Sequence, residues 1–361
     1  MHKLTFTALA VWLLTSCTPA ASVQTFSADN YPAQLSAWRL LDAGLSINPD
    51  SVYYSLNTTL FSDYAHKLRT VYLPAGTSAT YNEFESFEFP VGSVISKTFF
   101  YAEDATGRVI LDSAWTGDTN NLPTGSRPLE TRLLVRQQDG WDALPYIWRG
   151  NEAYLSLTGD LMQLTSSEDE TFTYLVPSRN QCASCHATDH TEGAVKPIGM
   201  KARHLNRTQP GNNRNQLDLL AEQDWLDGLP APEARPANAN SLDLTDDPVE
   251  LAHRARSYLD INCGHCHNPA GAADTSGLLL DYQDHNLAAL GECKPPIAAG
   301  RGSGGRVYSI VPGHPDQSIM LFRLTSTDPA VMMPELGRSL AHTEGNALIS
   351  GWINSLTGEC R

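Results

Sequence analysis

The first half of the chain is dominated by short runs of alternating apolar and polar residues or of consecutive β-branched and aromatic residues. Such runs are typical of strands, and the Gly, Asp and Asn residues between them are typical of turns. The clearest runs cover residues 94–101, 131–136, 143–148 and 171–176. Several short strands joined by tight turns favour an antiparallel sheet. We therefore predict a mainly antiparallel β domain over residues 31–205.

The last third of the chain has a helical pattern instead. Asp247 and Pro248 form a good N-cap and first-turn pair, and apolar residues then recur at helical spacing. Pro315 precedes a second helical run, and Thr343 precedes a third. This pattern predicts an all-α domain over residues 246–361.

Two segments outside these domains carry few apolar residues. Residues 206–245 are rich in Asn, Pro and Ala, which is typical of a linker, although residues 217–226 are compatible with one short helix. Residues 17–30 are small and polar, and we interpret them as a tether. The pattern as a whole predicts an α+β multidomain protein.

The N-terminus carries the longest apolar run of the sequence. His2 and Lys3 form a short basic segment, and the apolar residues 4–14 that follow are too few to span a bilayer. This arrangement is typical of an export signal. We therefore interpret residues 1–16 as a signal peptide.

Cys17 ends the segment Leu14-Thr15-Ser16-Cys17, which resembles the lipobox of bacterial lipoproteins. The resemblance implies that Cys17 is acylated, and two or three acyl chains give stable anchoring. Thr18, rather than Asp, follows the cysteine, which favours the outer membrane of a Gram-negative bacterium. We therefore expect a lipid anchor on the periplasmic side of that membrane. The alternative is an ordinary cleaved signal with an incidental cysteine.

Acidic residues outnumber basic residues by 40 to 25, so the formal net charge is -15. An acidic exported protein is poorly suited to bind nucleic acid or an anionic lipid surface. The charge therefore excludes nucleic acid as an expected partner and favours a basic protein partner, if any.

Two copies of one short motif carry the candidate chemistry. They are Cys182-Ala183-Ser184-Cys185-His186 and Cys263-Gly264-His265-Cys266-His267. C-x-x-C-H is the attachment site of a c-type haem, in which both thiols bond to the porphyrin and the histidine ligates the iron. We predict two covalently bound haem c groups. The predicted attachment residues are Cys182, Cys185, Cys263 and Cys266, and the predicted iron ligands are His186 and His267.

Two of the seven cysteines remain after lipid and haem attachment are assigned. They are Cys293 and Cys360. Because the expected compartment is oxidising, we predict a disulfide between them. The alternative is a pair of buried free thiols.

The second haem has a candidate for its other iron ligand. Met332-Met333-Pro334 lies between two predicted helices, and methionine is a common second ligand of haem iron. We predict Met333 as this ligand, with Met332 as the alternative. A pair of methionines that only fill the core would have the same composition.

The first haem has no comparable ligand segment. Met162, Met200, His190 and His204 are all candidates, but none lies in a recognisable ligand loop. The first haem is therefore compatible with a five-coordinate iron, which can bind a small molecule.

Three further basic residues concern the surroundings of the haems. Arg301 and Arg306 lie in a Gly-rich loop and are hypothesised to pair with haem propionates. His265, inside the second motif, is expected to face solvent.

Four segments, together with both haem motifs, resemble an uncharacterised family of bacterial diheme c-type cytochromes. The segments begin at Leu60, Phe89, Glu130 and Met333, and they read LFSDYA, FPVG, ETRLLVR and MPELGRSL. The resemblance covers nearly the whole mature chain and implies haem binding and electron transfer. The C-terminal part also resembles class I cytochrome c, which implies an all-α haem domain there.

The first domain is distantly similar to the cytochromes with a lysine-crosslinked haem that oxidise hydroxylamine. Their crosslinking lysine lies in a strand that roughly matches residues 131–136, where this chain has Arg136. The chain departs from that pattern, since arginine does not readily make the same bond.

The sequence therefore predicts a membrane-anchored periplasmic diheme cytochrome that exchanges electrons with redox partner proteins. The alternative is a diheme redox enzyme that acts on hydroxylamine or peroxide at a five-coordinate first haem. A zinc protein that uses the same Cys and His residues is a third hypothesis. An electron carrier is favoured over an enzyme, and no catalytic residue is assigned.

Overall fold

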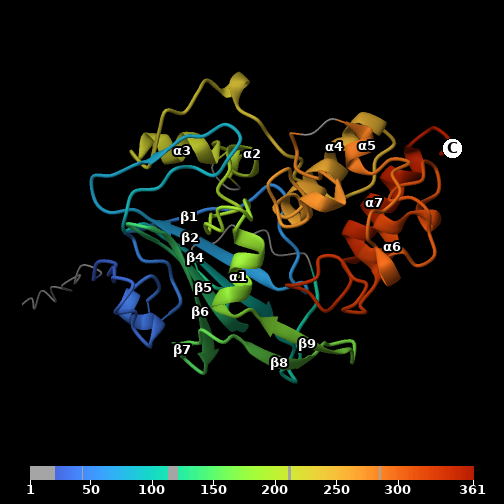
Figure 1. The fold of residues 1–361 in the computed structure, drawn as a ribbon. Helices are drawn as coiled ribbons and strands as arrows, with labels where there is room; N and C mark the ends of the chain where they lie inside the picture. Colours follow the sequence, from blue (N-terminus) through green and yellow to red (C-terminus); the bar gives the residue numbers. More distant parts are fainter. Residues whose placement is uncertain (1–20, 43, 113–120, 210–212, 284–285) are drawn as a thin grey trace, which may run out of the picture.

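Six strands form one antiparallel sheet in the order β1-β2-β4-β5-β6-β7 (Figure 1). The computed structural model describes residues 21–42, 44–112, 121–209, 213–283 and 286–361. The sheet strands are β1 (Ser51–Tyr53), β2 (His66–Tyr72), β4 (Val94–Ala102), β5 (Ser126–Gln137), β6 (Gly140–Arg149) and β7 (Glu152–Leu155).

Both faces of the large sheet are covered, because successive side chains of a strand point to opposite faces and apolar residues occupy both of them. Leu133 and Leu144 are buried on one face with Trp38 of the N-terminal segment. On the other face, Ile95 of β4 packs in a second core that includes Met200. The strands therefore carry apolar side chains on two sides.

Two smaller sheets flank the large one. β8 (Asp160–Thr165) and β9 (Thr171–Val176) form an antiparallel hairpin, and β9 leads directly into the first haem motif. β3 (Ala79–Thr80) pairs in parallel with β10 (Leu226–Asp227), which joins two segments that are far apart in sequence.

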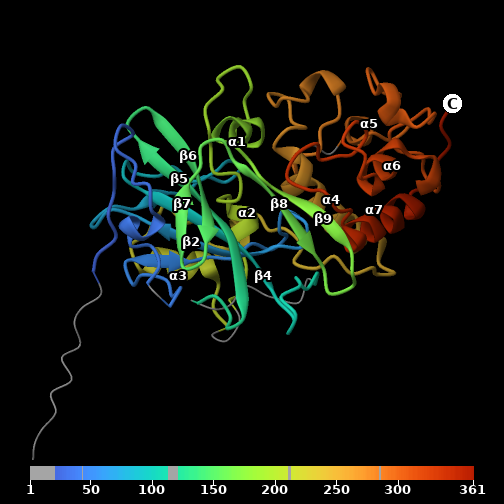
Figure 2. The same cartoon turned by 90° about the horizontal axis from the view of Figure 1, so that it is seen from below.

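Seven short α-helices surround the sheet within the described residues. The first, α1, lies over one face of the sheet, whereas α4, α6 and α7 lie together to one side (Figures 1 and 2). The helices are α1 (Arg179–His186), α2 (Ala202–Leu205), α3 (Gln216–Glu222), α4 (Pro248–Leu259), α5 (Leu287–Leu290), α6 (Ile319–Thr325) and α7 (Thr343–Ser355). Single 3₁₀ turns cover Leu35–Trp38, Pro232–Ala234, Asp274–Ser276, Gly300–Ser303 and Pro315–Gln317.

Helices α4 and α7 form the core of the C-terminal part. Leu251 and Ala255 of α4 are buried in the same cluster as Leu348 of α7. A Cβ atom at Gly345 would lie 2.5 Å from the ring of Tyr258. The glycine therefore permits the close approach of the two helices.

The predicted fold class is wrong in its C-terminal half. The described chain is predominantly antiparallel sheet and 24% helical, and no all-α class I cytochrome c domain is evident in these residues. The helical patterns at α4 and α7 are confirmed, but long irregular loops separate them. These loops depend on the β part: Asp63 accepts backbone N–H groups of Ser339 and Leu340 at 2.7 Å each, and Phe61 donates its N–H to Asn262 at 2.8 Å.

The segments interpreted as tether and linker pack against the rest of the chain where they are described. Val23 is 6% exposed, and its N–H donates to Asp50 at 3.2 Å. Leu217 and Leu220 of α3 are buried in the same core as Ile95 and Met200, on one face of the large sheet. Residues 1–16 and Cys17 lie outside the described residues. Within the described ranges, no helix combines the length and apolar character needed to cross a bilayer.

Candidate haem attachment site

The first motif lies on α1, and a capping box fixes where this helix begins. The Ser178 side chain accepts the N–H of Gln181, and the Gln181 side chain accepts the N–H of Ser178. Such reciprocal capping satisfies two N–H groups that the first turn leaves without partners. Cys182, Cys185 and His186 therefore lie on a well-defined helical turn directly after β9.

His186 is oriented as an iron ligand requires. Its Nδ1 lies 2.7 Å from the carbonyl oxygen of Lys196, so this nitrogen donates a proton and Nε2 is the nitrogen left for a metal. Burial, together with the nearby charge of Lys97, lowers the pKa of His186 to about 4. The ring is therefore neutral near pH 7, which is the form that ligates iron.

The second motif begins where α4 ends. Asp247 caps α4 by accepting the N–H groups of Val249 and Glu250, and a π-helical turn over Asp260–Gly264 continues the helix into the motif. Single π turns of this kind are frequent at functional sites. His267 follows, with Nδ1 at 3.3 Å from the Ser276 hydroxyl, and burial lowers the pKa of this histidine to about 4.

The two motifs contact each other although they are far apart in sequence. The Cys266 thiol donates to the carbonyl oxygen of Ser184 at 3.5 Å, and Cys185 lies within hydrogen-bond reach of Cys266 and His265. Just beyond the motifs, the N–H of His190 donates to the carbonyl oxygen of Ala270 at 2.8 Å. This contact was not predictable from the sequence, because neither motif indicates what it packs against.

A cavity lies between the sheet, α1 and the C-terminal loops. It contains about 1460 Å³ of space between atoms, part of it open to solvent. Cys182, Cys185 and His186 line it on one side, and Tyr258 and Met333 line it on another. His265, which was expected to face solvent, is only 7% exposed and lines this cavity, whereas Cys263, Cys266 and His267 are not among the described lining residues.

The charged residues of the cavity are all basic. Five basic side chains line it, and no Asp or Glu is among the described lining residues. The basic residues are Lys67 and Arg69 of β2, Lys97 of β4, Arg132 of β5 and Arg338 of a C-terminal loop.

The basic residues that the sequence suggested for haem propionates lie elsewhere. Arg301 is exposed and pairs with Asp328 at 3.0 Å, and Arg306 lies 4.3 Å from the centre of the Phe322 ring. Neither residue lines the cavity, and Arg136 does not line it either. Which cationic side chains face the cavity depends on the register of the strands, and this register was not predictable from the sequence.

Met333 lines the cavity, whereas Met332 is 7% exposed and packs in the interior. The N–H of Met333 donates to the carbonyl oxygen of Arg323 at 3.0 Å, and the charge of Arg323 acts on His267. The Met333 loop therefore passes close to the second motif. Its role as an iron ligand stays a prediction.

The four candidate ligands of the first haem are in different surroundings. Met200 is 2% exposed and lines the cavity together with His186. Met162 lies on β8 against another core, and His190 is exposed. His204 is fully buried in a polar network. Of these four, only Met200 shares the cavity with the first motif.

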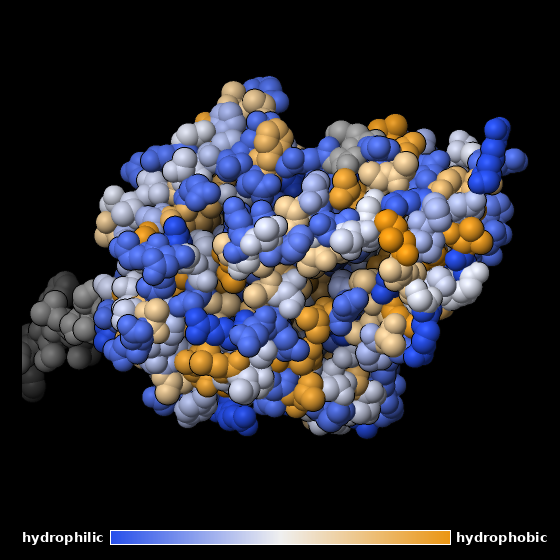
Figure 3. Space-filling model, viewed as in Figure 1, coloured by the Kyte–Doolittle hydropathy of each residue, from blue (hydrophilic) through white to orange (hydrophobic). Residues whose placement is uncertain are grey.

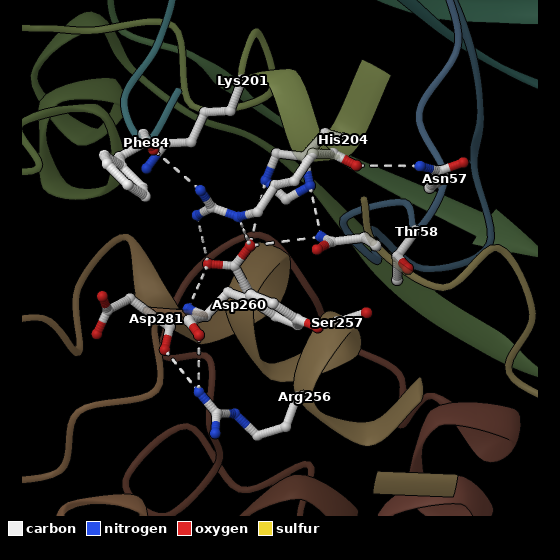
Figure 4. A network of polar contacts seen from close by, with 12 residues as sticks. Asn57, Thr58, Phe84, Lys201, His204, Arg256, Ser257, Asp260 and Asp281 are labelled. Carbon is white, nitrogen blue, oxygen red and sulfur yellow. Dashed lines mark hydrogen bonds and ion pairs between the residues drawn. The ribbon is translucent and has the colours of Figure 1, made fainter. Parts of the chain in front are cut away.

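This polar network joins α2 to the turn that precedes the second motif (Figure 4). Arg203 donates two hydrogen bonds to Asp260, each at 2.7 Å, and both side chains are 3% exposed. His204 lies 3.4 Å from the same carboxylate and accepts a hydrogen bond from Asn238 at 2.9 Å. Arg203 keeps the pKa of Asp260 well below its usual range despite burial. The network fixes the second motif relative to the β part.

Because of this buried network, we expect the free energy of unfolding to be lower in acid. Burial lowers the pKa of His204 to about 3, so the unfolded chain binds a proton near pH 6.5 that the folded chain does not. The free energy of unfolding should therefore fall as the pH decreases from 6.5 toward 3, by on the order of a few kcal/mol. Urea unfolding at pH 7, 5.5 and 4.5 measures this slope. The variant His204→Gln should reduce this slope but not abolish it, because burial also lowers the pKa values of His186 and His267 to about 4. An unchanged slope would assign the pH effect to these other groups.

Cys293 and Cys360, the predicted pair, are joined by a disulfide with a Cα–Cα distance of 5.0 Å. The bond ties the C-terminal end of the chain to the loop after the second motif. Cys182, Cys185, Cys263 and Cys266 are free thiols in the described chain, so all four are available for thioether bonds.

The zinc hypothesis gains no support from the geometry. Among the described residues, no group of three or more His, Cys, Asp and Glu side chains is placed to hold a metal ion.

Comparisons with models of protein families, with curated proteins and with solved structures give no match. Any proposal about function therefore rests on the residues described above.

Proposed function

We propose that this chain is a diheme c-type cytochrome that carries electrons between redox partner proteins. The observation that carries the proposal is that the two C-x-x-C-H motifs pack against each other, with Cys266 in contact with Ser184 at 3.5 Å. Two motifs that merely matched by chance would not be expected to fold against each other. Haem supplies a reversible one-electron couple when it is bound.

The residues around the motifs have the properties that haem attachment needs. All four motif thiols are free, and His186 and His267 are neutral near pH 7 because burial lowers both pKa values to about 4. Each histidine also has Nδ1 next to an oxygen, at 2.7 Å for His186 and 3.3 Å for His267. Such contacts orient the ring of a ligating histidine.

The proposed cellular location rests on the sequence alone. A signal peptide over residues 1–16 and acylation at Cys17 would anchor the protein to the periplasmic side of the outer membrane. On the face seen in Figure 3, hydrophobic residues form several small patches among polar ones. This face therefore favours no single partner surface.

A redox enzyme is the second candidate, and one observation favours it. The charged residues that line the cavity beside His186 are basic, and Met200 alone among the predicted ligand candidates for this haem lines it. An iron that lacked a second protein ligand would leave this space for a small molecule. Hydroxylamine and peroxide are the types of substrate that such a redox enzyme would use.

Electron paramagnetic resonance of the oxidised protein separates the two candidates. A pure electron carrier should give two low-spin signals, since both irons would have two protein ligands. Met333→Ala should convert one of these signals to high spin, with Met332→Ala as the matched control that changes neither. A high-spin signal in the unaltered protein that responds to peroxide or nitric oxide would contradict the carrier and favour the enzyme.

A further inference from the structure

We propose that the buried basic row formed by Arg69, Lys97 and Arg132 binds the propionate carboxylates of the haem attached at the first motif. This inference rests on the proposed function, because it requires a haem at Cys182 and Cys185. It assigns to that haem a specific surface of the sheet, which neither motif by itself indicates.

The row is a consequence of strand register. Arg69 of β2 lies directly opposite Lys97 of β4, and Lys97 lies directly opposite Arg132 of β5. All three side chains line the same cavity as Cys182 and His186. Neighbouring strands are about 4.8 Å apart, so the row extends roughly 10 Å across the sheet.

One end of the row lies beside the first motif. The charges of Arg132 and Lys97 both act on the Cys182 thiol, and Lys97 also acts on His186. Arg69, two strands away from Arg132, lies at the other end. A haem bonded through its vinyl edge to Cys182 presents its propionate edge on the opposite side of the ring. The row therefore extends away from the predicted thioether bond, as binding of the propionates at its far end would require.

The charges of the row are unevenly compensated in the chain itself. Arg132 donates two hydrogen bonds to the buried Glu130, at 2.7 and 2.5 Å. Among the described residues, Arg69 donates to a backbone oxygen, that of Lys67, at 3.3 Å. The ammonium of Lys97 faces the Phe99 ring at 5.2 Å, and Lys67 donates to the oxygen of Ala65 at 3.0 Å. Like charges directly opposite each other on adjacent strands are destabilising.

The electrostatics of the cavity favour an anionic ligand. Burial and the neighbouring cations lower the pKa of Lys97 to about 7 and hold the pKa of Lys67 well below its usual range. The groups that face them are Arg69, Arg132 and Glu130 on the strands, His186 on α1, and Asp63 and Arg338 on loops.

A carboxylate ligand accounts for this arrangement better than solvent does. The chain has 40 acidic residues, yet none of the described residues that line this cavity is Asp or Glu. Glu130 acts on the row, and Asp63 on Lys67, from outside the lining, so a carboxylate inside the cavity would come with a ligand. A haem brings two carboxylates, and an arginine binds a carboxylate through two parallel hydrogen bonds.

The test compares the holoprotein with its Arg69→Gln variant by spectroelectrochemical titration between pH 5 and pH 8. Removal of the arginine should lower one midpoint potential and make it pH-dependent, because the released propionate then titrates in this range. The other midpoint should not move. Arg69→Lys, which keeps the charge, should restore the original pH profile. Arg301→Gln is the matched control, and it should change neither haem because Arg301 pairs with Asp328 on the surface.

Three outcomes overturn the inference. If Arg69→Gln carries both haems and has the pH profile of the unaltered protein, the row does not bind the propionates. If added succinate perturbs the absorption spectrum of the unaltered holoprotein, and Arg69→Gln abolishes this response without changing the pH profile, the row binds a free carboxylate instead. If purified unaltered protein carries no haem, the proposed function itself fails, which is a distinct result.

Discussion

Replacing Cys182 and Cys185 together with alanine should reduce the haem content from two groups per chain to one. Each haem is held by two thioether bonds, and both bonds of the first haem are lost in this variant. The second motif keeps Cys263, Cys266 and its histidine, so its haem should remain. Intact mass and the absorption spectrum of the denatured protein in alkaline pyridine measure the haem content.

Two matched variants complete this experiment. The double replacement of Cys263 and Cys266 should remove the other haem and leave the first. Replacing Cys293 and Cys360, which form the disulfide, should leave both haems attached. A first-motif variant that still carried two haems would contradict the assignment of Cys182 and Cys185.

Replacing Arg203 with leucine should lower the free energy of unfolding by about 3–5 kcal/mol. The change leaves the Asp260 carboxylate buried, at 3% exposure, without the two hydrogen bonds at 2.7 Å that compensate its charge. An uncompensated buried charge is among the most destabilising changes that one substitution can make. Chemical denaturation at pH 7, followed by circular dichroism, measures the loss.

An exposed ion pair provides the control for this prediction. Arg301 pairs with Asp328 at 3.0 Å, but both side chains are largely in solvent. Arg301→Leu should therefore change the free energy of unfolding by less than about 1 kcal/mol. The double variant Arg203→Leu with Asp260→Leu should recover part of the stability. A loss for Arg203→Leu no larger than that for Arg301→Leu would show that the network does not hold the second motif in place.

Local sequence patterns predicted several elements correctly. The alternating runs at residues 94–101 and 131–136 lie in β4 and β5, and the Asp247-Pro248 pair begins α4. These signals depend on residues close together in the chain, where side-chain alternation and capping act directly.

The domain architecture was not predictable from the same signals. The helical pattern of α4 and α7 predicts a complete all-α domain, yet the segments between them hold only the short helices α5 and α6, single 3₁₀ turns and loops that depend on the β part. Asp63 holds Ser339 and Leu340, and Arg203 holds Asp260. These contacts join residues far apart in sequence, so no local pattern indicates them.

The candidate site was also predictable only in part. The motif residues were found directly from their spacing, since the chemistry of haem attachment requires it. The basic row was missed because its members come from three strands, and only the register places Arg69, Lys97 and Arg132 side by side. The sequence instead suggested Arg301 and Arg306, which share a Gly-rich loop but lie on the surface.

The most direct test of the central claim is the haem content of the unaltered protein from a host that matures c-type cytochromes. We predict a red protein whose intact mass exceeds that of the mature chain by two haem groups, with the spectrum of haem c in alkaline pyridine. A colourless protein with the mass of the polypeptide alone would contradict the account.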